Sequence, residues 1–196
     1  SAHVGTQLRL VGDADAAGSI KQMQSFKQEV SDAKTGDRVG VCIKGLVPSS
    51  ERGLLVDPRA GVLRGKQFVA KCSLSRHFPV KVKQGQHFSI NVGSETLGAR
   101  IYVFEKSVRA QLEESAEPRA VRVRRLGPED ITSKHAYTAI LDFEGEQSFV
   151  QSQQFIGVKL DVGPKQPRIA LYGTIAFPID LAQYQFVCPS EQRVAL

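Results

Sequence analysis

The sequence predicts an all-β protein that contains two small β-barrel modules. Apolar and polar residues alternate with a period of two through most of the chain, the alternating segments are short, and Gly, Pro, Asp or Ser separate them. A chain of 196 residues is long enough for two small β domains or one large one. Its longest apolar runs are too short to cross a membrane, and its first residues have no signal-peptide pattern.

Eight segments show this alternation, and each is predicted to be a strand. In chain order they are 38–46, 67–75, 87–92, 99–105, 121–125, 137–143, 155–162 and 168–177. In the first of them, Val39, Val41 and Ile43 share one face. Arg38 therefore faces the other side. Only 109–117 has helical character, and it is predicted to be a charged surface loop or a single turn because it has almost no apolar face.

The junction between the modules is predicted at 57–66, where DPRAGVLRGK combines a proline, two glycines and three cationic residues. We therefore expect one module over 1–60 and another over 66–182, followed by a weakly patterned tail over 183–196. A closed barrel of this kind needs about six strands. The first module is short for that, so we expect it to be incomplete at its N-terminus.

The cysteines and the net charge limit the class of protein. Cys42, Cys72 and Cys188 form no CxxC pair, so we expect neither a disulfide framework nor a zinc site, and a reducing cytoplasm fits best. Cys42 and Cys72 lie within strand patterns and are predicted to be small core residues. The four histidines have no ligand spacing, which predicts no metal. The net charge of +6 favours polyanionic partners such as phosphate backbones.

The search for catalytic motifs is nearly empty. The segment GSETLGAR (93–100) has the glycine spacing of a phosphate-binding loop but lacks its lysine and hydroxyl residue, so it is predicted to be a hairpin turn. Neither HExxH nor GxSxG is present. A nucleophilic cysteine paired with a distant histidine is the enzymatic alternative that remains.

Basic residues gather in two segments. The first contains Arg76, Lys81 and Lys83, interleaved with His77, Phe78, His87 and Phe88. The second contains Arg119, Arg122, Arg124 and Arg125. In a strand, Arg122 and Arg124 share one face while Val121 and Val123 share the other. This arrangement indicates either a surface that follows phosphates or a solvated, edge-protecting strand face.

The stretch KQMQSFKQEVSDAKTGDRVGVCIKGLVPSSERGLLVDP (21–58) resembles the second domain of the tRNA-carrying translation GTPases. It has their strand ending in Q-x-F, their A-x-x-G-[DE]-x-V-G and their E-R-G-L. The next block, RHFPVKVKQGQHFSINVGSETLGARI (76–101), is similar to the third domain of these factors, as are YTAILDF, FIGVKLDV and RIALYGTIAF. The resemblance covers about 7–105 and 136–177. It implies two β-barrels, the first of which receives the aminoacylated 3′ end of tRNA.

Within this superfamily the chain most resembles the selenocysteine-specific elongation factors. Three features carry this resemblance: the Met-Gln-x-Phe of 23–26, the Gly-Asp-Arg of 36–38, and a long charged insertion near 106–135. The resemblance implies a protein that binds selenocysteinyl-tRNA and delivers it to the ribosome at recoded UGA codons. General elongation factors usually have a neutral residue at the position of Arg38, and a general tRNA carrier remains one alternative. A basic all-β module that binds a protein partner is another.

The resemblance assigns Arg38 and Gln24 to the pocket for the amino acid and the terminal adenine. A selenol is more acidic than a thiol, whose pKa is about 8.5, so near neutral pH it is largely an anion, whereas the serine on the same tRNA is neutral. A guanidinium is always charged, and its charge-assisted hydrogen bond is worth roughly 1.5–3 kcal/mol. The alternatives are a surface arginine near Asp37 and, for Gln24, a polar residue on a strand face.

The resemblance also implies contacts with the tRNA stem. Arg52, in Glu51-Arg52-Gly53, matches an arginine near the 5′ end of the acceptor stem, and its alternative is a turn salt bridge with Glu51 or Asp57. A second group lies where the third domain approaches the T-stem backbone, namely Arg76, His77, Lys81 and Lys83.

Several parts of these factors have no counterpart in the sequence. The GTPase domain, with its phosphate loop and NKxD, is absent, so the chain is expected not to be an enzyme, and GTP and Mg²⁺ would belong to that missing domain. The first strands of the second domain are also absent, as is the fourth domain, which engages a selenocysteine-element RNA or its binding protein. The expected protein is therefore a cytoplasmic fragment with no membrane partner.

Overall fold

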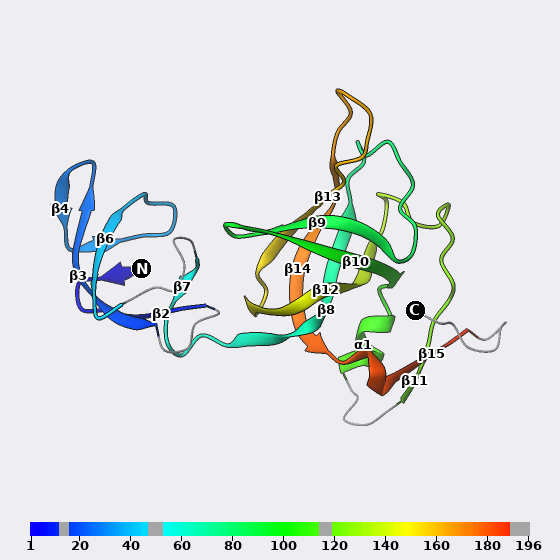
Figure 1. Cartoon of the computed structure of the whole chain (residues 1–196), viewed down its shortest axis with the longest axis horizontal. Helices are drawn as coiled ribbons and strands as arrows, with labels where there is room; N and C mark the ends of the chain where they lie inside the picture. The colour runs from blue at the N-terminus through cyan, green and yellow to red at the C-terminus, as the bar shows by residue number, and fades with distance from the viewer. Residues whose placement is uncertain (12–15, 47–52, 114–118, 189–196) are drawn as a thin grey trace. The chain divides into compact units, whose positions relative to one another are not determined.

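The computed structural model describes residues 1–11, 16–46, 53–113 and 119–188. The chain divides into two compact units, Ser1–Val62 and Leu63–Leu196, at a point inside the predicted junction 57–66 (Figure 1). Strands dominate both units, so the all-β prediction is confirmed. None of the helices among the described residues has the length and apolar character needed to span a membrane.

The first unit is built on a five-stranded sheet and a separate two-stranded ladder. Its strands are β1 (Ala2–His3), β2 (Gln7–Leu10), β3 (Ala17–Ser25), β4 (Gln28–Val30), β5 (Asp32–Ala33), β6 (Gly40–Lys44) and β7 (Leu55–Val56). The order is β4-β3-β2-β7, with β6 also paired to β3, while β1 pairs with β5. The sheet does not close into a barrel within the described residues. Its buried cluster is small and consists of Ile20, Met23 and Ala33.

The second unit contains a closed six-stranded barrel. Its strands are β8 (Val62–Leu74), β9 (Gln86–Val92), β10 (Glu95–Glu105), β12 (Ala136–Val150), β13 (Gln154–Val158) and β14 (Ile169–Ile179). They follow the order β10-β12-β8-β14-β13-β9. The rings of Phe68, Phe143 and Phe149 pack together inside, with centroids 4.9–6.0 Å apart. The closed barrel predicted for the second module is therefore confirmed.

The segment between β10 and β12 adds a second apolar cluster to the barrel unit. It contains a helix, α1 (Val108–Glu113), and a strand, β11 (Arg119–Arg122), which pairs in parallel with β15 (Tyr184–Val187) (Figure 1). A 3-10 turn, η1 (Leu181–Gln183), precedes β15. The cluster comprises Val69, Phe104, Val108, Leu112, Val121, Val123, Ile140, Ile179 and Phe186.

This cluster corrects two predictions. The stretch 109–117 was expected to be a charged surface loop or a single turn with almost no apolar face. The helix is indeed short, at six residues, but Val108 and Leu112, four residues apart, give it a narrow apolar face that is buried. The stretch 183–188 was expected to belong to a weakly patterned tail, but β15 is paired and Phe186 is buried. A parallel partner more than sixty residues away leaves no local pattern that would identify it.

The cysteines also differ from expectation in one case. Cys72 is buried in β8, as predicted, and burial raises the pKa of its thiol to about 12. Cys42 was predicted to be a core residue, but it is exposed. It lies opposite Gln22 on the polar face of β6, because Val41 and Ile43 take the other face.

The predicted junction contains an ordered turn. Both carboxylate oxygens of Asp57 bind the Arg59 guanidinium, at 3.1 and 3.0 Å. This interaction lowers the pKa of Asp57 to about 2. Arg9 on β2 donates to the Ala60 carbonyl at 2.7 Å, so the start of the junction is tied to the first unit.

Candidate functional site

The structure places Gln24 and the backbone next to Arg38 on one exposed face of the first unit. Gln24 on β3 lies opposite Gly40 on β6, two residues beyond Arg38. The Ser25 hydroxyl donates to the Arg38 carbonyl at 3.3 Å, which holds this segment against the end of β3. Both Arg38 and Gln24 are exposed. Gln24 thus lies on β3 beside the start of β6, and Arg38 lies in the segment that leads into β6 rather than in the strand predicted over 38–46.

The Arg38 guanidinium has no ion pair or hydrogen bond within the part of the chain that the structure describes. The pairing with Asp37 that would make it an ordinary surface arginine is not formed. The Asp37 carboxylate instead accepts a hydrogen bond from the Lys34 backbone at 2.7 Å. The charge of Arg38 thus remains available to a ligand.

This site is an open face and not a walled pocket. A Cβ atom placed on Gly40 would meet only the Gln24 carbonyl oxygen, at 3.8 Å, among atoms within 4 Å. Cys42 and Gln22 continue the same face along the two strands. A ligand that binds here would lie across the exposed sheet surface.

A hairpin tip beside this face was not among the predicted site residues. Phe26 and Lys27 join β3 to β4, and both have positive φ angles, of 49° and 68°. Two-residue hairpins of this kind favour Asn-Gly because left-handed backbone is costly for bulky residues. Phe26 is also 91% exposed. The sequence offered one signal for this hairpin tip. At the end of the Met-Gln-x-Phe motif, two residues without glycine separate two strands.

The predicted stem contacts divide between described and undescribed residues. Arg52 lies outside the described residues. Its alternative partner Glu51 lies outside them too, and the other, Asp57, already has both carboxylate oxygens bound by Arg59.

The other four predicted contacts lie on the loop between β8 and β9. Val82 is fully buried and Phe78 packs against the barrel core, so the loop is anchored from inside. Around these anchors the loop exposes its basic residues, namely Arg76, His77, Lys81 and Lys83. The structure therefore brings these four together on one loop of the second unit.

The pairing state of these cations differs. Arg76 Nε donates to His77 Nε2 at 3.0 Å. The Lys81 ammonium forms an ion pair with Glu129, from the insertion near 106–135. Lys83 has no ion pair within the described part of the chain, although its backbone donates to the Gln86 side chain at 3.1 Å. Lys83 is thus the unpaired lysine of this loop.

The second basic segment follows the predicted alternation. Val121 and Val123 are buried, and Arg122 and Arg124 are exposed. Arg124, however, is shared between two carboxylates, Glu105 at 3.7 Å and Asp130 at 3.3 Å. The resulting surface is less cationic than its sequence suggests.

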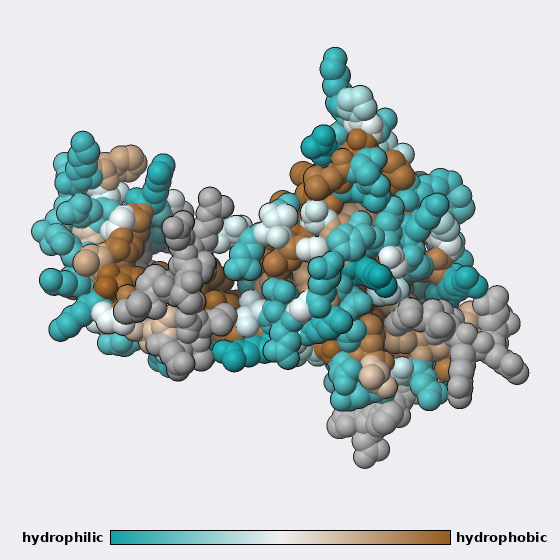
Figure 2. Space-filling view, in the orientation of Figure 1, coloured by the Kyte–Doolittle hydropathy of each residue, from teal (hydrophilic) through white to brown (hydrophobic). Residues whose placement is uncertain are grey.

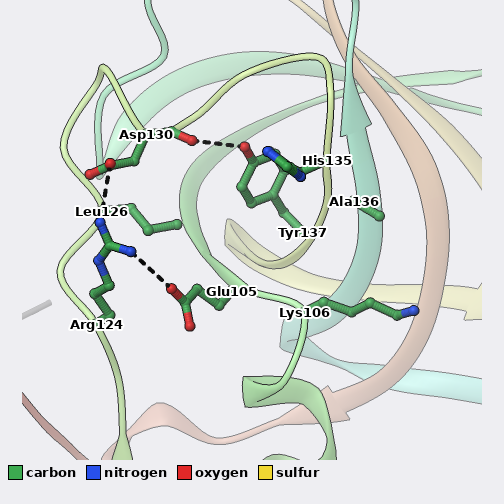
Figure 3. A pocket seen from close by; sticks show the side chains of 8 residues that line it. All are labelled: Glu105, Lys106, Arg124, Leu126, Asp130, His135, Ala136 and Tyr137. Atoms are coloured by element: carbon green, nitrogen blue, oxygen red, sulfur yellow. Dashed lines mark hydrogen bonds and ion pairs between the residues drawn. The ribbon is translucent and has the colours of Figure 1, made fainter.

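A cavity of about 350 Å³ lies beneath this part of the insertion (Figure 3). Its lining residues are Glu105, Lys106, Arg124, Leu126, Asp130, His135, Ala136 and Tyr137. The Tyr137 hydroxyl accepts a hydrogen bond from the Thr132 backbone at 2.8 Å and donates one to the Asp130 carbonyl at 2.9 Å. These bonds fasten the loop that arches over the cavity.

Exposed apolar side chains gather on the hairpin of β13 and β14. Ile156 and Tyr172 face each other across the two strands and are 41% and 50% exposed. Leu160 and Ile169 extend this surface toward the hairpin loop. Figure 2 shows apolar surface around this hairpin.

The segment with phosphate-loop glycine spacing has the structure predicted for it. Segment 93–100 forms the turn and strand of the hairpin between β9 and β10, as predicted, and Gly93 has a φ of 59°. No group of three His, Cys, Asp or Glu side chains that could hold a metal ion occurs among the residues described.

Comparison with known proteins gives one consistent result. The chain is 27% identical over 176 residues to the selenocysteine-specific elongation factor of Methanocaldococcus jannaschii, covering 88% of this chain and 35% of that protein. It thus spans about a third of the length of this curated relative. No family model matches the chain.

Two solved structures resemble it in fold. Both are of translation elongation factor SelB from Methanococcus maripaludis, one in the apo form and one in complex with the GTP analogue GppNHp. Each has a TM-score of 0.70 and covers 94% of this chain and 39% of the other, at 20% and 22% identity respectively. Over most of its length, the chain is therefore similar to a part of the selenocysteine-specific elongation factors, and the resemblance predicted from its motifs is confirmed.

Proposed function

We propose that this chain is the tRNA-holding part of an elongation factor of the selenocysteine-specific type. Its similarity to such a factor supports a role in translation. The observation that most supports tRNA binding is the exposed face where Gln24 lies opposite Gly40, two residues from Arg38. There, Gln24 would contact the terminal adenine and Arg38 the amino acid, so that selenocysteinyl-tRNA is held for delivery at UGA codons.

The charge of Arg38 supplies the selectivity in this proposal. A selenolate carries a negative charge that serine lacks, and the unpaired guanidinium has no competing carboxylate among the described residues. A charge-assisted hydrogen bond worth roughly 1.5–3 kcal/mol corresponds to about ten- to a hundred-fold in affinity. The exposed Phe26 ring at the neighbouring hairpin tip offers an apolar edge to the same ligand.

The loop between β8 and β9 would supply contacts to the tRNA backbone that do not depend on the nucleotide sequence. Arg76, Lys81 and Lys83 are exposed on a loop that Val82 anchors in the barrel core. Lysine and arginine side chains on a rigid loop neutralise phosphates, and the electrostatic contribution of these contacts makes RNA affinity dependent on salt. The loop would therefore bind the phosphate backbone of the tRNA, and Arg52 of the first unit would add a contact with the acceptor stem.

The remaining parts of the proposed activity lie outside this chain. GTP binding and hydrolysis, with Mg²⁺, would need a GTPase domain, so the chain itself would not be an enzyme. Contacts with the ribosome, and with a selenocysteine-element RNA or its binding protein, would accompany such domains. We propose the cytoplasm as the site of action because tRNA delivery takes place there.

The test is a salt titration of tRNA binding. Log affinity should fall linearly with log salt between about 50 and 200 mM. Lys83→Ala should weaken binding for every tRNA alike, whereas Lys71→Ala, which removes an exposed lysine from the outside of β8, should change it little. Flat titrations would reject tRNA binding, and equal losses for both variants would reject the loop between β8 and β9 as its site.

One observation favours a protein partner as a second candidate function. The Ile156–Tyr172 pair exposes apolar surface on a barrel that is otherwise well packed. If binding to tRNA is absent, a protein partner on this hairpin becomes the leading proposal.

A further inference from the structure

A compact turn in the insertion carries two acidic residues with different partners. In residues 127–130, the Asp130 backbone donates to the Gly127 carbonyl at 3.0 Å, and the Gly127 backbone donates to the Asp130 carboxylate at 2.9 Å. Pro128 lies between them, which further restricts the backbone. This closed structure, called here the 127–130 turn, is held by its own hydrogen bonds.

The turn is also fastened to the rest of the unit. Asp130 binds Arg124 at 3.3 Å, and its carbonyl accepts a hydrogen bond from the Tyr137 hydroxyl at 2.9 Å (Figure 3). Tyr137 is itself buried at the start of β12. Glu129 therefore projects from a support with little freedom to move.

Glu129 uses this position to reach the loop between β8 and β9. Its carboxylate pairs with the Lys81 ammonium, 48 residues away in the sequence, although both side chains are largely exposed. Lys83, two residues further along the same loop, has no such partner among the described residues. The insertion thus neutralises one lysine of the proposed tRNA-binding loop and leaves the other.

We propose that Glu129 acts as a built-in competitor of RNA phosphate for Lys81. A carboxylate and a phosphate are both anionic acceptors for an ammonium, so RNA can use Lys81 only when Glu129 releases it. The inference rests on the proposed tRNA binding and deepens it: the insertion lowers the affinity of the loop for any RNA backbone. Selectivity then depends more on the aminoacyl end, because unselective phosphate contacts are weakened.

A supporting role for Glu129 would predict the opposite change in RNA affinity when Glu129 is replaced. If Glu129 served to hold Lys81 in the orientation that phosphate requires, its removal would weaken RNA binding. Competition predicts that its removal strengthens binding. Exposed ion pairs are weak, so the expected gain is modest, about two- to five-fold in affinity.

The experiment compares four proteins with the wild type, using deacylated tRNA as the probe. Glu129→Gln keeps the shape of the side chain and removes its charge, while Glu95→Gln makes the same change at an exposed position of the hairpin between β9 and β10. Lys81→Met and the double variant Lys81→Met/Glu129→Gln complete a double-mutant cycle. Affinities are measured between about 50 and 200 mM salt.

Competition predicts a gain of about two- to five-fold in Glu129→Gln that shrinks as salt rises, since salt screens both the ion pair and the RNA contact. The gain should disappear in the Lys81→Met background, and Glu95→Gln should show little change. An affinity for tRNA that is unchanged or lower in Glu129→Gln overturns the inference. An equal gain in affinity in Glu95→Gln, or in Glu129→Gln in the Lys81→Met background, also overturns it, because it would indicate general charge repulsion.

The two proposals fail in distinguishable ways. If the log affinity of the wild type for tRNA falls linearly with log salt and Glu129→Gln binds tRNA no better, only the proposed competition of Glu129 with RNA phosphate is rejected. If the wild type shows no salt-dependent binding, both the proposed tRNA binding and the proposed competition are rejected.

Discussion

Gln111 binds both backbone groups of Arg122. The Arg122 N–H donates to Gln111 Oε1 at 2.9 Å, and Gln111 Nε2 donates to the Arg122 carbonyl at 3.1 Å. The side-chain amide thus takes the place of a neighbouring strand along the free edge of β11. This pair ties helix α1 to β11, and it fixes the backbone from which Arg122 projects.

Replacing Gln111 should loosen that edge. Gln111→Leu removes both hydrogen bonds, and we expect a loss of about 1 kcal/mol in the free energy of unfolding, because each net bond contributes about 0.5–1.5 kcal/mol and this site is partly exposed to water. Amide exchange at Arg122 should accelerate more than exchange in the barrel strands. Gln185→Leu, at an exposed position of β15, is the matched control and should leave both measurements nearly unchanged.

The hairpin tip between β3 and β4 should be more stable with a residue suited to its backbone. Phe26 has a φ of 49° and is 91% exposed, so its ring contributes little to packing while its backbone is strained. Left-handed backbone costs roughly 1–2 kcal/mol for an ordinary residue, and asparagine tolerates it better. Phe26→Asn should therefore raise the midpoint of thermal unfolding of the first unit. Val4→Asn also removes an exposed apolar side chain, but Val4 has no positive φ, and it should give no such gain.

The cysteines should differ sharply in reactivity. Cys42 is exposed, whereas burial raises the pKa of Cys72 to about 12, so near neutral pH almost no Cys72 thiolate exists. A thiol reagent should modify Cys42 in the native protein and Cys72 only after unfolding, as peptide mapping by mass spectrometry would show. Because Cys42 shares the face of Gln24, bound aminoacyl-tRNA should slow its modification. Equal rates with and without that ligand would place the ligand elsewhere.

Arg38 provides the test of amino-acid selectivity. Arg38→Ala should reduce the discrimination between selenocysteinyl- and seryl-tRNA about ten- to a hundred-fold, with little change in affinity for seryl-tRNA. Arg38→Lys should restore only part of it, because an ammonium lacks the fork geometry of a guanidinium. The measurement is the dissociation of both aminoacyl-tRNAs from each protein. Equal losses would make Arg38 a general tRNA contact, and no losses would make it an ordinary surface residue.

Local sequence patterns determined much of this protein. Alternation predicted the buried positions of Val121 and Val123, and the turn between Val92 and Glu95 was evident from its glycine and flanking strands. These features depend on neighbours within a few residues, because side chains alternate across a strand and a short turn fixes the register of its hairpin. The motifs around Gln24 and Arg38 also led to the prediction of a shared site, and the structure places Gln24 opposite Gly40, two residues from Arg38.

Only the tertiary structure decided which distant segments meet. The burial of Phe186 depends on the parallel pairing of β11 with β15, which joins segments that share no local signal. The contact of Glu129 with Lys81 arises because a closed turn of the insertion reaches a loop of the barrel. Such contacts depend on how the barrel strands bring remote parts of the chain together. Periodicity along the sequence carries no information about which remote segments lie close in space.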